Sequence, residues 1–280
     1  MTDDDPNSRV EPSMHLDFSN RMSYSDYLKL ETLLTAQSPL SDEPDEMLFI
    51  IVHHVQELWI RLIIHELNFA MKSLRQADMG VAFKALARIS RIQEQLVSAW
   101  DVLSTMTPAD YLTFRSKLGG ASGFQSHQYR MMEILLGARD KKMLRPHKHR
   151  QEIYAQLLRA FEAPSIYDEA IAFLARAGFS VPNDLLNRDF STTHRYSKAL
   201  SNIWLEVYRS PENHFDAYQL AEELVDVEDW FQQWRFRHMT TVHRIIGNKT
   251  GTGGSSGVSY LRNALHRTFF SELWDVRTRL

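Results

Sequence analysis

The chain has 280 residues, of which 44% are hydrophobic and 24% are charged, a composition typical of a soluble globular protein. Its 32 basic and 35 acidic side chains leave a net charge of -3, so we expect no nucleic-acid partner. The chain contains no cysteine, which excludes disulfides, thiolate-ligated haem, cysteine-held iron–sulfur clusters and a cysteine nucleophile. Any metal must therefore be bound by histidine or by oxygen ligands.

The first twenty residues are polar and acidic and lack both the basic and the apolar region of a signal peptide. The most apolar run, residues 47–52, is too short to span a bilayer. We therefore expect a cytoplasmic protein that does not act on a membrane.

After the N-terminal segment, apolar residues recur along the chain at the spacing of helix faces. Residues from 47 to about 72 predict a helix that is apolar on nearly every side and therefore buried. Residues 80–104 predict an amphipathic helix. Thr107 and Pro108 predict the N-cap and first residue of another helix, which stops at two glycines, 119 and 120. Further helices are predicted over 124–136, about 150–161, 165–177 and 194–208, from about 211 to 246, and from about 259 onwards.

Residues 138–150 form the most polar stretch and predict an exposed connection. No run of alternating apolar and polar residues bounded by turn signals predicts a strand. We therefore expect a single all-α domain over residues 1–280, with a bundle-like core of long antiparallel helices.

A glycine-rich loop, GNKTGTGGSSG (247–257), follows the longest of these helices. A phosphate-binding loop requires a preceding strand and a lysine after its glycines, and this loop has neither. A slack linker and a loop that orders over a ligand both remain possible. Its short length between two apolar helices favours the second interpretation.

The histidines do not form a familiar metal motif. His238 and His243 are five residues apart, which places them about 140° apart around a helix, and the neighbours His53 and His54 also diverge. The chain has no ExxH and no HExxH, as di-iron bundles and zinc sites would require. Two histidines on different helices can face a flat cofactor from opposite sides, but a structural role for each remains open.

Two further pairs have the i,i+4 spacing of one helix face. Phe49 and His53 place an aromatic ring beside an imidazole, and Tyr111 and Arg115 place a phenol beside a guanidinium. Arginine fits a carboxylate with two parallel hydrogen bonds. The alternative is a surface arginine that shields a core tyrosine.

Together these segments resemble the haem-dependent tryptophan 2,3-dioxygenase family in its bacterial form. The resemblance extends from about residue 24 to residue 278. Its strongest blocks are DEMLFIIVHHVQELW (45–59), TPADYLTFRSKLGGASGFQSHQYR (107–130), LVDVEDWFQQWRFRHMTTVHRIIGNKTGTGGSSG (224–257) and FFSELWDVRT (269–278).

The resemblance implies insertion of O2 across the indole C2–C3 bond of L-tryptophan, which gives N-formyl-L-kynurenine. It implies haem b as the cofactor, with His238 as the ligand of the iron. His53 is then the distal catalytic histidine and hydrogen-bonds the indole N–H. The remaining substrate contacts that it implies are Phe49 beside the indole, Arg115 and Tyr111 at the carboxylate, and Thr252 at the ammonium and carboxylate end. Further residues implied to line the haem or its pocket are Trp100, Leu118 and Ser122.

The resemblance also implies a homotetramer built as a dimer of dimers. The N-terminal segment, about residues 1–30, then covers the pocket of the neighbouring subunit through Tyr24, Tyr27 and Leu28. Two interpretations from other classes remain: a non-haem metal-dependent helical oxidase, and a helical binding or scaffold protein whose histidines are structural.

Overall fold

A computed structural model describes residues 9–11 and 13–280, and within these ranges it contains helices and no strand. The predicted all-α class is confirmed. The chain divides into two compact units, Met1–Pro39 and Leu40–Leu280. Part of the predicted N-terminal covering segment, residues 1–8 and 12, lies outside the described residues.

The first unit contains two short helices, α1 (Tyr24–Leu28) and α2 (Leu30–Leu34). Ser23 begins α1 with a capping box, in which its hydroxyl accepts from the Asp26 backbone while the Asp26 carboxylate accepts from the Ser23 backbone. Tyr24 and Tyr27 are both largely exposed, each at 74%.

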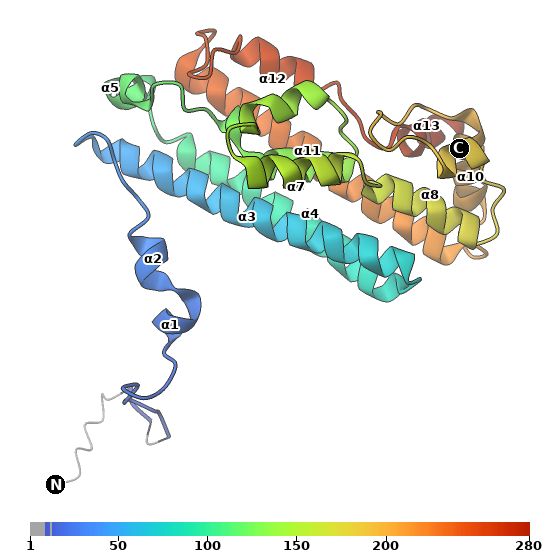
Figure 1. The fold of residues 1–280 in the computed structure, drawn as a ribbon, viewed down its shortest axis with the longest axis horizontal. Helices are drawn as coiled ribbons and strands as arrows, with labels where there is room; N and C mark the ends of the chain where they lie inside the picture. Colours follow the sequence, from blue (N-terminus) through green and yellow to red (C-terminus); the bar gives the residue numbers. More distant parts are fainter. Residues whose placement is uncertain (1–8, 12) are drawn as a thin grey trace. The chain divides into compact units, whose positions relative to one another are not determined.

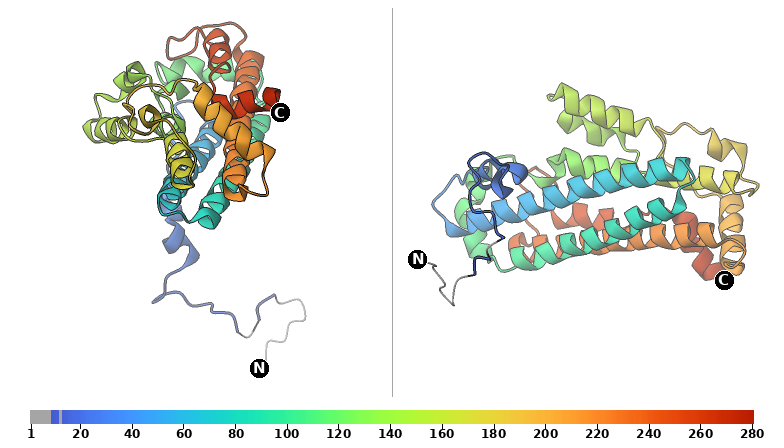
Figure 2. Two further views of the ribbon diagram at one scale, coloured as in Figure 1. Left: turned by 90° about the vertical axis from the view of Figure 1, so that its right-hand side faces the viewer. Right: turned by 90° about the horizontal axis from the view of Figure 1, so that it is seen from below.

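Three long helices organise the second unit: α3 (Pro44–Arg75), α4 (Met79–Leu103) and α11 (Phe215–Ile246). They run side by side, with α4 packed against both others (Figures 1 and 2). The amphipathic pattern predicted for α4 is confirmed, because every apolar residue on its predicted stripe is buried. This stripe comprises Ala82, Leu86, Ile89, Ile92, Leu96, Trp100 and Leu103.

The prediction that α3 is buried on all sides is wrong. Met47, Ile51, Val55 and Leu58 follow one face of the helix at three- and four-residue spacing, and each is between 38% and 50% exposed. The neighbouring helices α4, α6 and α8 cover the other faces. By length and composition alone, α3 is the one helix in the described part of the chain that could cross a membrane.

The segment after α4 forms α5 (Pro108–Arg115), η1 (Ser116–Leu118), η2 (Gly123–Gln125) and α6 (His127–Leu136). Thr107 caps α5 as predicted, and it forms a capping box with Asp110. Because the first turn of α5 is fixed in this way, Tyr111 and Arg115 project from a well-defined helix.

The remaining helices lie around the long ones, with α12 near the α5 end of the second unit and α10 and α13 at the opposite end (Figure 1). Their bounds are η3 (Lys141–His147), α7 (Gln151–Phe161), α8 (Ile166–Arg176), α9 (Asn183–Leu186), α10 (Lys198–Arg209), α12 (Val258–Ala264) and α13 (Ser271–Arg279).

Two predictions about these segments are corrected. The stretch 138–150 is not a fully exposed connection, because Leu144 and His147 are buried within the 3-10 helix η3. The single helix expected from about residue 259 is two helices, α12 and α13. The Glu228 carboxylate accepts from the backbone N–H of Phe270 at 3.0 Å and from Trp274 Nε1 at 2.9 Å, and thereby fixes the start of α13.

Candidate functional site

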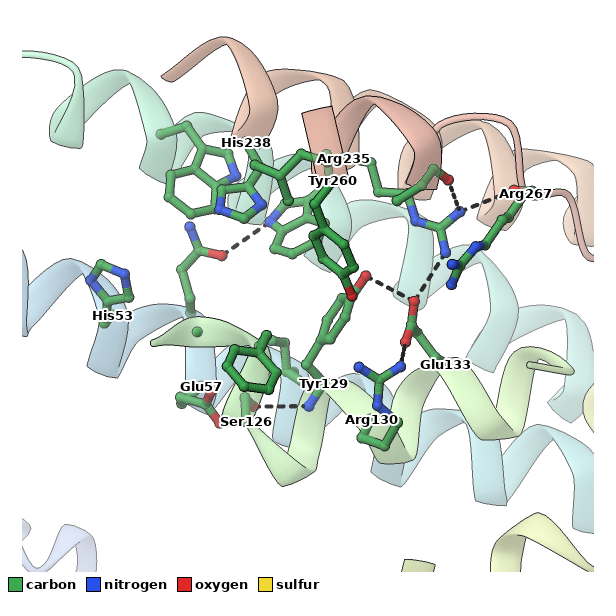
Figure 3. A pocket seen from close by; sticks show the side chains of 18 residues that line it. His53, Glu57, Ser126, Tyr129, Arg130, Glu133, Arg235, His238, Tyr260 and Arg267 are labelled. Atoms are coloured by element: carbon green, nitrogen blue, oxygen red, sulfur yellow. Dashed lines mark hydrogen bonds and ion pairs between the residues drawn. The ribbon is translucent and has the colours of Figure 1, made fainter. Parts of the chain in front are cut away.

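A cavity of about 900 Å³, counting the space at its open mouth, lies between α3, α4, α6, α11 and α12. His53 of α3 and His238 of α11 both line it, although 185 positions separate them in the sequence. Tyr129 and Tyr260 project into the same space from α6 and α12 (Figure 3).

His238 is positioned by two indole rings. Its imidazole stacks on Trp100, with ring centroids 4.6 Å apart and planes inclined by 15°, and Trp234 lies 5.5 Å away. Burial, together with the nearby His53, lowers the pKa of His238 to about 4. The imidazole is therefore neutral at neutral pH. None of its recorded contacts within the described residues is a hydrogen bond, so its ring nitrogens can bind a metal.

His53 is held by its own helix. Its Nδ1 lies 2.7 Å from the backbone carbonyl oxygen of Phe49. Because a carbonyl only accepts, we assign the proton to Nδ1, and Nε2 is then free to accept a hydrogen bond. Burial lowers the pKa of His53 below its usual range. The residue therefore acts as a neutral acceptor rather than as a cation.

Four buried N–H groups on the cavity residues have no acceptor among the described residues. They are Gln56 Nε2, Trp100 Nε1, Arg130 Nε and Arg235 Nε. The carbonyl oxygen of Gln56 already accepts from Trp234 Nε1 at 3.0 Å. Since buried donors without acceptors are costly, an occupant that brings acceptor atoms is favoured here.

One end of the cavity carries three arginines, Arg130, Arg235 and Arg267, which we call the cationic end (Figure 3). Arg130 and Arg235 are both buried, and both form ion pairs with Glu133. The Tyr129 hydroxyl also donates to Glu133, at 2.9 Å. The Glu133 carboxylate is thus the counter-ion of two buried guanidinium groups.

Apart from His53, none of the residues predicted to bind substrate lines the cavity. The Phe49 ring is 4.1 Å from the His53 ring and 5.9 Å from that of Tyr111. Arg115 donates a 2.5 Å hydrogen bond to the backbone carbonyl of Thr250. Burial raises the pKa of the Tyr111 phenol, so it remains protonated at neutral pH. An unbroken series of contacts therefore connects His53 to α5, and Arg115 connects α5 to the glycine-rich loop.

The glycine-rich loop packs closely on the segment between η1 and η2. The hydroxyl of Thr252 donates to the carbonyl of Ala121 at 2.6 Å. A Cβ on Gly253 would lie 2.8 Å from Ser122 Cβ and equally close to Phe124 Cδ1, so only glycine fits without displacement. The loop is thus held against this segment by a hydrogen bond and by direct backbone packing.

Of the other predicted site residues, some line the cavity and others lie elsewhere. Trp100 lines the cavity, and Leu118 packs against the main hydrophobic core. Ser122 lies beside Gly253. The three N-terminal residues predicted to cover a neighbour, Tyr24, Tyr27 and Leu28, belong to α1 in the first unit. The roles proposed for all of them stay predictions.

Sequence reasoning did not assign six polar residues to the site that the structure places on the cavity wall: Gln56, Tyr129, Arg130, Glu133, Arg235 and Arg267. A signal was present, because Arg130 and Glu133 interrupt the apolar pattern of α6, and Arg235 sits between apolar residues of α11. A buried charge in an apolar helix requires a partner. The sequence could not indicate that these partners share one cavity.

The described residues contain no group of three or more histidine, aspartate or glutamate side chains placed to hold a metal ion. This arrangement does not favour a non-haem metal site. A single neutral histidine on an aromatic wall suits a metal whose other ligands come from a macrocycle.

Comparisons with known proteins identify one family. A family model described as tryptophan 2,3-dioxygenase matches residues 10–206 and 181–280. A protein of that name from Bacillus thuringiensis subsp. konkukian is 52% identical over 271 residues, which cover 97% of each chain. Another from Polaromonas sp. is 55% identical over 265 residues, which cover 95% of this chain and 90% of the relative. A third from Bordetella pertussis is 53% identical over 280 residues, with 98% and 99% covered.

Proposed function

The chain belongs to the tryptophan 2,3-dioxygenase family, and on that premise we propose that it is a haem-dependent dioxygenase. It inserts both atoms of O2 across the indole C2–C3 bond of L-tryptophan and yields N-formyl-L-kynurenine, the first step of tryptophan catabolism by the kynurenine route. The observation that carries the proposal is the cavity in which a neutral, unpaired His238 lies across from His53.

The cavity residues fit a haem in three respects. His238 supplies a neutral imidazole, the usual axial ligand in haem proteins. Trp100, Trp234 and Tyr129 supply aromatic walls for a flat macrocycle. The unsatisfied N–H donors suit a group that carries acceptor oxygens. When bound, haem b supplies the redox chemistry that activates O2.

His53 orients the indole in this proposal. With the proton on Nδ1 held by Phe49, Nε2 accepts a hydrogen bond from the indole N–H. The indole N–H is too weak an acid for a neutral imidazole of lowered pKa to deprotonate readily, so His53 positions the ring rather than removing its proton. Phe49, in ring contact with His53, forms the adjoining wall.

Arg115 and Thr252 bind the amino-acid end of the substrate. The Arg115 guanidinium pairs with the carboxylate, Tyr111 supports that contact, and the Thr252 hydroxyl meets the ammonium and carboxylate groups. The support is their position: Phe49 links Tyr111 to His53, and the loop that carries Thr252 is bonded to Arg115. Holding both ends of L-tryptophan fixes the indole for reaction.

The proposal includes a cytoplasmic homotetramer, a dimer of dimers, in which the chain forms one catalytic domain. In it, residues 1–30 cover the pocket of a neighbouring subunit. The two exposed tyrosines of α1, together with Leu28, support this role, because large exposed aromatic groups favour burial against a partner. Leu118 and Ser122 complete the pocket wall beside Trp100.

A visible spectrum of the full chain purified after expression with haem tests the proposal. We expect an intense Soret band that shifts on reduction and again on addition of L-tryptophan, together with formation of N-formyl-L-kynurenine under O2. A colourless, folded chain that binds no added haem would leave a helical binding or scaffold protein as the better interpretation.

A further inference from the structure

We propose that the chain carries a binding site for a small oxyanion of the phosphate type at the start of α7. It is formed by His127 of α6, His147 of η3 and Arg150, the residue that precedes α7. We call these three residues the anion site. None of them lines the cavity that holds the candidate site, so the proposal goes beyond the proposed function and does not depend on it.

The first argument is a buried imidazole with an unsatisfied atom. His147 is 3% exposed, and its buried Nε2 has no hydrogen-bond partner among the described residues. Its ring lies beside that of His127, with centroids 6.5 Å apart and planes inclined by 76°. A buried polar atom without a partner is costly, so an occupant that forms a hydrogen bond with this imidazole is favoured.

The second argument is the positive charge around this imidazole. Burial lowers the pKa of His147, and nearby positive groups lower it further. These groups are His127, Arg130, His149 and Arg150. Charges that oppose the protonation of an imidazole attract an anion for the same reason, so an anion among them would relieve their mutual repulsion.

The acidic side chains close to the anion site do not cancel this charge. Glu57 raises the pKa of His127, but burial, the largest effect, and two nearby guanidinium groups outweigh it, and the net shift is downward. The Glu57 carboxylate is already bonded to Gln128 Nε2 at 2.8 Å. Glu152, in the first turn of α7, is exposed to solvent. The stretch 138–150 contains six basic residues and one acidic residue, so its surplus is positive.

The third argument is the start of α7 itself. This helix has 11 residues, and the side chain of its N-cap residue, Arg150, makes no capping hydrogen bond. The first N–H groups of a helix have no partner within it, and together with the helix dipole they attract anions. The backbone N–H of Arg150 donates to the carbonyl of His147 at 2.9 Å, which holds the imidazole close to this helix end. An oxyanion has enough oxygens to accept from the helix end, the guanidinium and the imidazole together.

The experiment titrates the full chain with inorganic phosphate and with glycerol phosphate, at an ionic strength kept constant with sodium chloride. Calorimetry gives the affinity, and the rise in melting temperature is an independent measure of binding. The variants are Arg150→Met and His147→Phe. The matched controls are Lys141→Met, which removes an exposed positive charge from η3, and Arg267→Met, which removes one from the cationic end. The protein is used as purified, with its haem, and a chain that carried no haem would be titrated in the same way, so failure of the proposed function leaves this test intact.

We expect both phosphates to bind wild type and to raise its melting temperature more than chloride does. The tighter of the two identifies the ligand as a free phosphate or as a phosphate monoester. Arg150→Met should lose about 10-fold in affinity and His147→Phe about 3- to 10-fold, because each removes a hydrogen bond to the anion. Both controls should stay within about twofold of wild type. Arg150 is exposed, so Arg150→Met carries the test if His147→Phe does not fold.

Three results would overturn the proposal. Equal losses in Lys141→Met and Arg150→Met would mean that the basic segment attracts anions without a specific site. A loss confined to Arg267→Met would locate the anion in the cavity instead. A wild type that binds phosphate no better than chloride would leave the start of α7 without a ligand.

Discussion

The guanidinium of Arg115 donates a 2.5 Å hydrogen bond to the backbone carbonyl of Thr250, so that α5 and the glycine-rich loop meet at one side chain. A guanidinium binds a carboxylate more strongly than a neutral carbonyl. A substrate carboxylate can therefore take the place of the Thr250 carbonyl. The same exchange would release the loop from Arg115 and allow Thr252 to meet the substrate.

Arg115→Met should reduce kcat/KM for L-tryptophan by roughly 10- to 100-fold, because the charge-assisted pair with the carboxylate is lost. Turnover or binding of tryptamine, which lacks the carboxylate, should change little. The measurement is the ratio of the two specificity constants. An unchanged preference for L-tryptophan over tryptamine would show that Arg115 does not bind the substrate carboxylate.

Gly253→Ala should raise KM for L-tryptophan by roughly 10-fold, because the new methyl group would collide with Ser122 and Phe124 and displace the loop. The matched control is Gly120→Ala in the facing segment, where an added Cβ meets open space and the backbone needs no glycine. We expect the control to retain wild-type kinetics. Equal effects of the two substitutions would argue against close packing at Gly253.

His238→Ala should purify with little haem, because it removes the one axial ligand that the proposal assigns to the iron. Absorbance per mole of purified chain measures this loss. His243→Ala is the control, since His243 is exposed on another face of α11 and does not line the cavity. A His238→Ala variant with full haem content and an unaltered spectrum would refute the assignment.

The pH profile of kcat/KM should reflect the lowered pKa of His53. A lowered pKa keeps the imidazole neutral, and able to accept from the indole N–H, at pH values below 6.5, the ordinary pKa of histidine. Activity due to His53 should therefore persist below pH 6.5 and fall only under more acid conditions. In His53→Gln the corresponding acid limb should be absent. A limb centred at or above pH 6.5 that disappears in His53→Gln would contradict the burial of this group.

Mixed oligomers can test the covering segment. An inactive His238→Ala subunit and a subunit that carries both Tyr24→Ala and Tyr27→Ala should each have low activity alone. If the segment acts on a neighbour, mixed assemblies combine an intact cavity with an intact neighbouring segment, and activity should rise on mixing. If the activity of the mixture equals the average of the separate proteins at every ratio, the segment covers the pocket of its own chain.

The sequence predicted the helices well because their signals are local. The α4 stripe and the Thr107–Pro108 start of α5 depend on spacing and on capping chemistry within a few residues. The exposed face of α3 could not be predicted in the same way. Its apolar residues appear on every side, and only the positions of α4, α6 and α8 determine which side remains uncovered.

The candidate site was predictable only in part. His53, His238 and Trp100 were singled out, and the structure brings them to one cavity. Arg130 and Glu133 were not, because their significance arises from contacts with Arg235, about a hundred positions away. Spacing along one helix carries no information about such contacts. The excess of positive charge at the cationic end is evident only when all the helices that line the cavity are considered together.

The helix α11 continues without interruption from His238 to Ile246, and the glycine-rich loop follows directly. A residue inserted between these points would rotate everything after it by about 100° and advance it by about 1.5 Å relative to the imidazole. Substitutions within this stretch can be absorbed locally, whereas a change in its length would turn Thr252 away from Arg115. In the descent of this chain, selection should therefore act on the number of residues between the histidine and the loop more strictly than on their identity.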